Sequence, residues 1–262
     1  APKAISILLL AGIVSVFIGI SLANQTKNYV SDHLYVGSYL ILAILTLIPA
    51  FFLFFFKNQN EVLTFSKENN KTRSYIQFLS EPKFLQAITS ASFAYVVMAF
   101  LMTATPISMH IINKLSLDKL GVVMQFHVLA MFLPSLVTGN LIKKFGYSKI
   151  MYAGVLFYIF TILMSFFEPS YLNYFLGLVF LGIGWNFLFV SGTSLLVTTY
   201  KPEEKFKAQG FNDLVVFSLT AVSSLSAGIL ISITSWKIVN LLCIPFLILI
   251  IFSIINAQRK SK

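Results

Sequence analysis

Charged residues are scarce in this chain of 262 residues, and their scarcity excludes a soluble globular domain. Asp, Glu, Lys and Arg together make up 11% of the sequence, whereas a soluble domain usually carries about 25%. Apolar residues make up 57%, and the mean hydropathy is +0.84. Such a chain cannot cover a water-facing surface with polar groups, so we expect an integral membrane protein.

Residues and motifs that serve catalysis or metal binding are also rare. The single cysteine, Cys243, excludes an intrachain disulfide and a cysteine-based zinc site. The sequence has no phosphate-binding P-loop, which argues against ATP-driven transport by this chain, and no pair of histidines at metal-ligand spacing. The sequence therefore predicts no metal, no cofactor and no enzymatic activity.

Long apolar runs, by contrast, are abundant. Eight runs are long enough to cross a bilayer as helices, for which about 20 residues suffice. None of them alternates in the manner of a barrel strand. They cover residues 4–24, 34–56, 84–108, 120–142, 148–167, 171–199, 208–233 and 237–256. The sequence therefore predicts an all-α membrane protein with eight transmembrane helices.

The basic residues alternate between the two sides of these predicted helices. If the N-terminus is cytoplasmic, 15 of the 19 basic residues lie on the cytoplasmic side, and the other four are Lys27, Lys114, Lys119 and Lys237. Lysine and arginine gather on the cytoplasmic side of membrane proteins. This asymmetry explains the net charge of +10 without nucleic acid. It predicts a multi-pass protein of the cell (inner) membrane, in contact with the lipid bilayer, with its linker and C-terminus in the cytoplasm.

One long polar connector, residues 57–83, separates the first two predicted spans from the last six. We interpret it as a cytoplasmic linker between residues 1–56 and a C-terminal six-helix bundle at 84–262. A shift of about 204 residues aligns the first two spans with the last two, which suggests a repeat of six helices. On that interpretation residues 1–56 are helices five and six of a first bundle, and the first four helices of a longer polypeptide are missing.

Two connectors resemble those of the major facilitator superfamily. Residues 139–149, Gly-Asn-Leu-Ile-Lys-Lys-Phe-Gly-Tyr-Ser-Lys, resemble the second-half copy of the family's short cytoplasmic motif. Gly139, Lys144 and Gly146 match its pattern, but Lys143 stands where the family has an acid. Residues 201–210 resemble the charged loop before helix eleven. The resemblance covers the whole chain and implies a partial twelve-helix fold, from helix five to helix twelve, in a secondary transporter.

Two ionisable residues stand out within the predicted spans, where charge is costly and often functional. His127, with Gln125 close by, is a candidate substrate contact; the alternative is a buried ring bonded to a neighbouring helix. Asp213, with Asn212 and Gln209, is a candidate for proton coupling. The alternative for Asp213 is a structural or gating role at the start of its helix, including an ion pair with a cytoplasmic base.

Other candidates follow from the resemblance and from residue type. The family lines its cavity with helices that correspond here to the third, fourth, sixth and seventh spans. Tyr95, Trp185 and Asn186 lie in these spans. The first two are large aromatic side chains with one polar group each, and Asn186 offers an amide; such side chains suit the wall of a ligand-binding site. Met98 lies on the same stretch as Tyr95. The resemblance also makes Gly139, Lys143, Lys144 and Gly146 candidates for gating.

The leading hypothesis is a secondary transporter that moves a small organic solute by alternating access, with protons as a candidate coupling ion. One alternative is a membrane-embedded enzyme that uses His127 and Asp213. Another is a membrane sensor or scaffold that transports nothing. The sequence specifies no substrate and no direction of transport.

Overall fold

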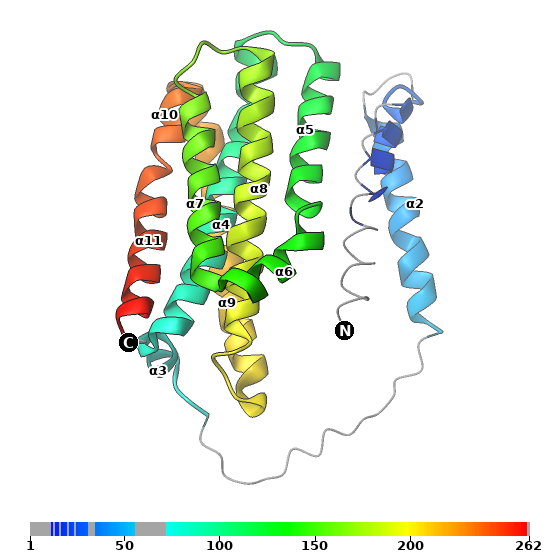
Figure 1. Cartoon of the computed structure of the whole chain (residues 1–262). Helices are drawn as coiled ribbons and strands as arrows, with labels where there is room; N and C mark the ends of the chain where they lie inside the picture. Colours follow the sequence, from blue (N-terminus) through cyan, green and yellow to red (C-terminus); the bar gives the residue numbers. More distant parts are fainter. Residues whose placement is uncertain are drawn as a thin grey trace. The chain divides into compact units, whose positions relative to one another are not determined.

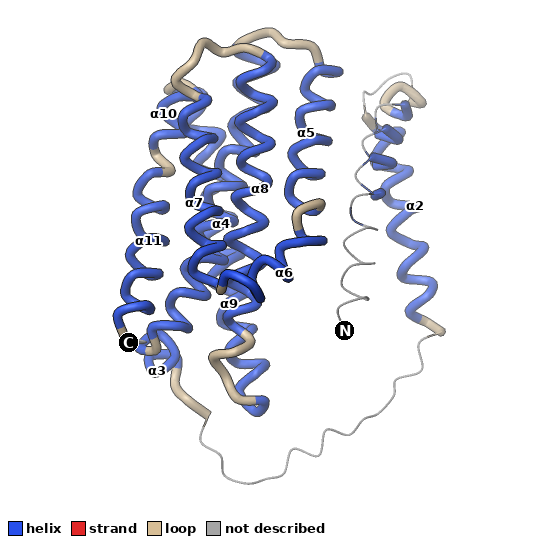
Figure 2. Tube along the Cα trace, in the orientation of Figure 1, coloured by secondary structure: helices blue, strands red, loops and turns tan. Residues whose placement is uncertain are grey.

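The computed structural model describes residues 35–55 and 72–260, together with residues 12, 14–15, 17–19, 21–23 and 25–30. Every regular element in these ranges is a helix, and none of the described residues forms a strand (Figures 1 and 2). The described residues from Thr72 onward form one compact unit, and the described residues between Val14 and Phe55 belong to a second.

Seven helical segments in the described ranges are long and apolar enough to cross a membrane. They confirm seven of the eight predicted spans to within a few residues. They are α2 (Val36–Leu53); α4 (Pro82–Pro106) continued by η1 (Ile107–Ile112); α5 (Leu117–Phe132) with α6 (Ser135–Phe145); α7 (Tyr147–Met164); α8 (Tyr171–Leu196); η2 (Pro202–Glu204) with α9 (Lys205–Ile233); and α10 (Trp236–Leu241) with α11 (Ile244–Arg259).

The predicted first span, 4–24, lies largely outside the described residues, so the eight-helix count stays a prediction. The described residues between Gly12 and Thr26 are helical. Most of the predicted linker also lies outside the described residues. Its last part, from Thr72 onward, is ordered structure that belongs to the C-terminal unit. There Ser74 caps the short helix α3 (Tyr75–Ser80) in a capping box with Gln77.

The C-terminal unit is built around α4, which packs against α8, α9 and α11, while α7 packs along α8 (Figure 1). Most of α4 is buried, and its side chains join those of α8 in one core. The fully buried Phe84, Leu101, Leu178 and Leu188 belong to this core. The helices therefore form one bundle in which α4 and α8 are the inner elements.

Close approach of α7 and α8 depends on two glycines that face each other. A Cβ at Gly184 would lie 2.5 Å from Cδ1 of Tyr158 and 2.9 Å from the carbonyl oxygen of Gly154. A Cβ at Gly154 would lie 2.7 Å from Cγ of Leu188. Small residues at such crossings let two membrane helices approach to backbone contact.

Two of the spanning segments are interrupted. Pro134 separates α5 from α6, because proline lacks the N–H that continues a helix. The last segment is also interrupted, by a turn at Leu242 and Cys243 between α10 and α11, which the sequence analysis did not anticipate. Pro245 is the second residue of α11, and its missing N–H explains why the helix restarts there.

Basic residues gather at one end of the C-terminal unit, where α3, the start of α7 and the end of α11 lie (Figure 1). We call this the lysine-rich end. Of the 13 basic residues between 72 and 260, ten lie there, and Lys114, Lys119 and Lys237 lie at the opposite end. The ten are Arg73, Lys83, Lys143, Lys144, Lys149, Lys201, Lys205, Lys207, Arg259 and Lys260.

Candidate functional site

Aromatic side chains from four helices meet in the C-terminal unit, and two of them are sequence-predicted candidates. Tyr95 of α4 contacts Trp185 of α8 edge to face, with ring centroids 5.2 Å apart. Tyr95 also meets Phe189 edge to face at 4.9 Å, and Phe189 stacks on Trp185 at 4.9 Å. Phe132 of α5 and Phe217 of α9 complete the group. We call these five residues the aromatic cluster.

The side chains of the aromatic cluster differ in solvent exposure. Trp185 is 4% exposed, whereas Tyr95 and Phe189 are half-buried and Phe217 is 61% exposed. The Nε1 of Trp185 has no hydrogen-bond partner among the described groups. A flat aromatic surface with an unpaired N–H donor can stack on a planar solute and donate to one of its acceptors. Sequence reasoning missed Phe189, although its spacing of four residues from Trp185 places both on one helix face.

The other predicted wall residues do not all join this cluster. Met98 is 7% exposed and belongs to the apolar core. Gln125 is half-buried on α5. His127 is fully buried, and its Nδ1 lies 2.8 Å from the carbonyl oxygen of Leu178 on α8. This contact is the one expected if His127 is a buried ring bonded to a neighbouring helix. The Nε2 of the same ring has no partner among the described residues.

Asn186 is fully buried at the break between α5 and α6. Its Nδ2 donates to the carbonyl oxygen of Met131, at 2.6 Å, and to the hydroxyl of Ser135. The Oγ1 of Thr138 lies 2.7 Å from Asn186 Oδ1 and 2.8 Å from the carbonyl oxygen of Pro134. A helix interrupted inside a membrane needs such partners for its freed backbone groups. In this structure, therefore, the amide of Asn186 bonds to both sides of the break.

The polar residues near the start of α9 form a small group of their own. Asp213 is exposed, and its Oδ1 accepts a hydrogen bond of 3.1 Å from Nδ2 of the buried Asn212. The Nε2 of Gln209 donates to the hydroxyl of Tyr200 at 2.7 Å. The expected alternative of an ion pair for Asp213 is not seen, because the ion pairs among the described residues involve Arg73, Glu81 and Glu204.

The motif-like loop adopts a geometry that explains two of its residue types. Gly146 has φ of +85° and ends α6 directly before α7, a conformation that favours glycine. Lys143 and Lys144 are exposed in the last turn of α6, where cations complement the helix end. Gly139 is exposed, with no atom within 4 Å of a built Cβ. Nothing in the described ranges pairs these lysines with an acid.

A network at the lysine-rich end was missed by the sequence analysis. Glu204, 4% exposed, accepts hydrogen bonds from Nε of Arg73 at 2.9 Å and from Nη2 at 2.7 Å. It also accepts from the backbone N–H groups of Arg73 and Lys201, both at 3.1 Å. Arg73 Nη1 bonds to Glu81 at 2.6 Å, and Lys207 donates to the carbonyl oxygen of Arg73 at 2.6 Å. We call these residues the Arg73 network.

The Arg73 network joins the chain before α3 to the loop before α9. Hydrogen bonding to Glu204 raises the pKa of Arg73 above its ordinary value, so the guanidinium is charged at any pH that a cell reaches. The ring of Phe78 lies 4.6 Å beneath the guanidinium carbon. Sequence reasoning noted the loop at 201–210 but placed Arg73 in a linker, because nothing local to Arg73 indicates a partner 131 residues away.

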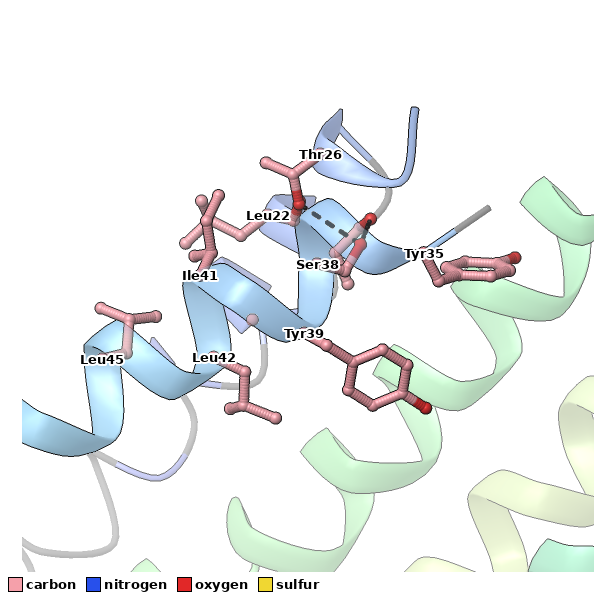
Figure 3. A pocket seen from close by; sticks show the side chains of 10 residues that line it. Leu22, Thr26, Tyr35, Ser38, Tyr39, Ile41, Leu42 and Leu45 are labelled. Carbon is pink, nitrogen blue, oxygen red and sulfur yellow. Dashed lines mark hydrogen bonds between the residues drawn. The ribbon is translucent and has the colours of Figure 1, made fainter. Parts of the chain in front are cut away.

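The N-terminal unit contains a separate hollow of about 410 Å³ (Figure 3). The Oγ1 of Thr26 donates to the carbonyl oxygen of Leu22 and lies 3.3 Å from Oγ of Ser38, which donates to Ala23. A Cβ at Gly37 would collide with the carbonyl of Thr26. Most lining side chains are apolar, among them Leu22, Ile41, Leu42 and Leu45. Among the described lining residues, tyrosine is the only titratable type.

No group of three or more His, Cys, Asp and Glu residues in the described part of the chain could hold a metal ion. His127 and Asp213, the pair that an enzyme would use, lie on different helices and differ in exposure. No hydrogen bond joins them in the described part of the chain.

Comparison with known proteins identifies relatives along most of the chain. Residues 87–261 match the sequence model of the Major Facilitator Superfamily. The riboflavin transporter RfnT of Brucella anthropi is 32% identical over 253 residues, which are 97% of this chain and 63% of RfnT. The uncharacterized MFS-type transporters YddS and YdeG of Bacillus subtilis are 32% and 31% identical, each over 56% of this chain and 34% of the relative. No solved structure matches.

Proposed function

Because this chain belongs to the major facilitator superfamily, we propose that it forms part of a secondary transporter that moves a small organic solute across a membrane. Transport would follow alternating access, in which two helical bundles rock about a site near the middle of the membrane. The chain spans 63% of the length of RfnT. We propose, as the sequence analysis expected, that further helices of the same polypeptide complete the site.

The aromatic cluster is the observation that supports a substrate class. We propose a planar aromatic solute, with riboflavin as the first candidate, since RfnT is named a riboflavin transporter. The half-buried rings of Tyr95 and Phe189 offer faces and edges for stacking. Stacking of a planar ring on an aromatic side chain contributes about 1–3 kcal/mol.

Uptake of radiolabelled riboflavin by cells that express the intact protein tests this proposal. We expect Tyr95→Ala and Phe189→Ala to reduce uptake about tenfold, because each removes one stacking surface. The matched control is Phe252→Ala, which removes an exposed ring of α11 outside the cluster. Excess unlabelled riboflavin should compete, and ribitol, which lacks the ring system, should not.

Two outcomes would contradict the substrate proposal. If riboflavin is not taken up, or if Tyr95→Ala and Phe252→Ala affect uptake equally, the cluster does not recognise the ring. A screen of other solutes under imposed gradients then tests transport itself. Absence of movement for every solute would favour the alternative of a membrane sensor or scaffold over a transporter.

The cytoplasmic placement of the lysine-rich end is also a proposal, supported by the ten-to-three distribution of basic residues. Tags inserted at residues 70 and 145 should be inaccessible to impermeant reagents in intact cells and accessible after permeabilisation. Labelling of either tag in intact cells would reverse the proposed orientation. We further propose a plasma (inner) membrane location, because the named relatives are bacterial.

Protons are the coupling ion that we propose to test first. Asp213 is the one acidic residue within the helical part of the seventh predicted span. If it carries the coupling proton, Asp213→Asn should abolish proton-driven uptake and leave counterflow exchange intact. Unchanged proton-driven uptake would leave Asp213 with a gating or structural role.

A further inference from the structure

A hollow of about 580 Å³ opens at the lysine-rich end of the C-terminal unit. Residues from five helices line it, at the starts of α4 and α7 and at the ends of α6, α8 and α11. Neither the aromatic cluster nor the Arg73 network contributes a side chain to it. The hollow therefore lies apart from both of these groups, beside the motif-like loop that contains Gly146.

The charges that line the hollow are all positive. Lys83 from α4 and Lys149 from α7 line it, and both are exposed. No acidic side chain is among the lining residues that the structure describes. Glu81, two residues before Lys83 in sequence, has its carboxylate bound by Arg73 at 2.6 Å. Two lysines around one concave surface without a nearby free acid create a positive potential that attracts an anion.

Hydrogen-bond donors accompany the two lysines. The start of α7 lines the hollow, and its N-cap residue, Gly146, provides no side-chain cap for the first N–H groups of the helix. Free N–H groups at a helix start favour anions. Gln86, 3% exposed, donates through Nε2 to Oγ of Ser148 at 3.0 Å. Because that oxygen already accepts, the hydroxyl proton of Ser148 remains to donate toward a ligand.

The lining also includes the apolar side chains of Phe145, Leu195 and Ala257, beside the polar Thr198 and Gln258. A small hydrated anion gains nothing from contact with an apolar surface, whereas the glycerol and acyl carbons of a phospholipid would bury that surface. The hollow also lies at the ends of spanning helices, which is the level of lipid headgroups. Anionic lipids of the cytoplasmic leaflet attract clustered lysines at this level.

We propose that this hollow binds the phosphate of an anionic phospholipid, with Lys83 and Lys149 as its charged contacts. Ser148 and the first N–H groups of α7 would donate to the phosphate oxygens. The proposal rests on the proposed orientation of the chain and not on the transported solute. Its test therefore reads lipid binding and not uptake.

The experiment measures lipid retained by the intact purified protein, with native mass spectrometry, after titration with phosphatidylglycerol or phosphatidylcholine. We expect phosphatidylglycerol to bind at least tenfold more tightly. The double variant Lys83→Gln/Lys149→Gln should reduce that binding by about 25-fold, since each lysine near an anionic lipid contributes about fivefold. Ser148→Ala, which changes no charge, should reduce it about threefold.

The matched control is Lys143→Gln/Lys144→Gln, which removes the same charge from exposed positions that do not line the hollow. Equal loss in both double variants would overturn the proposal, because it would show attraction by net charge alone. Full displacement of phosphatidylglycerol by equimolar inorganic phosphate would also overturn it, in favour of a soluble anion. If Lys83→Gln/Lys149→Gln does not fold, the loss expected of Ser148→Ala still decides the question.

Discussion

The lysine-rich end of the bundle and its middle are both held by polar side chains, but they use different chemistry. At the lysine-rich end, Arg73 forms ion pairs with Glu81 and with the buried Glu204. In the middle, Asn186 and Thr138 form a fully buried network without any charge. A charge deep in a membrane loses its hydration at great cost, whereas one near the surface keeps part of it. Charged partners therefore stabilise the lysine-rich end, and neutral partners stabilise the buried interior.

The largest expected effect comes from breaking the charged network. Glu204→Ala removes the acceptor of three hydrogen bonds from Arg73 and one from Lys201. We expect a loss of about 2–4 kcal/mol in stability, below the range for a fully buried pair because the Arg73 side chain is 31% exposed. The thermal midpoint of the detergent-purified protein measures it. The control is Glu203→Ala, at a neighbouring exposed position, which should leave the thermal midpoint unchanged. Equal losses in both variants would show that the Arg73 network does not stabilise the fold.

The neutral network should respond almost as strongly. Asn186→Leu leaves the carbonyl of Met131 and the hydroxyl of Thr138 without their buried partner. We expect a loss of about 2–3 kcal/mol, because unsatisfied buried groups cost about 1–3 kcal/mol. Asn140→Leu, at an exposed position of α6, is the control and should cost under about 0.5 kcal/mol. A stable Asn186→Leu protein without transport would instead assign Asn186 to the solute.

Packing at the crossing of α7 and α8 should give a smaller but measurable effect. Gly184→Ala places a methyl group against Tyr158 and the backbone of Gly154, and overpacking of this kind costs about 1–3 kcal/mol. Gly210→Ala is the control, because no atom lies within 4 Å of a Cβ at that position. That control should stabilise α9 by up to about 1 kcal/mol through helix propensity. A tolerated Gly184→Ala would show that the two helices separate easily.

The smallest expected effect is on the stability of Asp213→Asn. The carboxylate is exposed, and its one hydrogen bond within the described part of the chain comes from Asn212. We therefore expect a change within about 0.5 kcal/mol in the thermal midpoint. This neutrality makes the variant a clean test of proton coupling, because any change in uptake then reflects the titrating group. A large loss of stability would reveal a contact made with helices beyond the described ranges.

Much of the helical framework could be predicted from sequence. The apolar runs gave seven spans to within a few residues, because bilayer thickness sets helix length independently of tertiary contacts. The break between α5 and α6 lies at Pro134, whose missing N–H is an equally local property of the sequence. The second break, at Leu242 and Cys243, was not predicted, although Pro245 lies inside the predicted span 237–256 and lacks the N–H that a continuous helix needs.

The candidate site was predicted only in part. Tyr95 and Trp185 do lie together, yet their neighbours Phe189, Phe132 and Phe217 looked like ordinary apolar residues in the sequence. For His127 the sequence left two alternatives open, and the bond to Leu178 depends on how α5 packs on α8. The roles of these residues in transport remain predictions for the experiments above.

By itself, the sequence determined that this chain is helical, belongs in a membrane and carries its basic residues at alternate connectors. Those properties follow from composition and from the spacing of residues along the chain. A bilayer requires apolar segments of a certain length, with the charged residues in the connectors between them. Only the tertiary structure decided that Arg73 meets Glu204 and that Asn186 bridges a helix break. Such partners lie tens of residues apart, and their pairing depends on which helix faces turn toward each other.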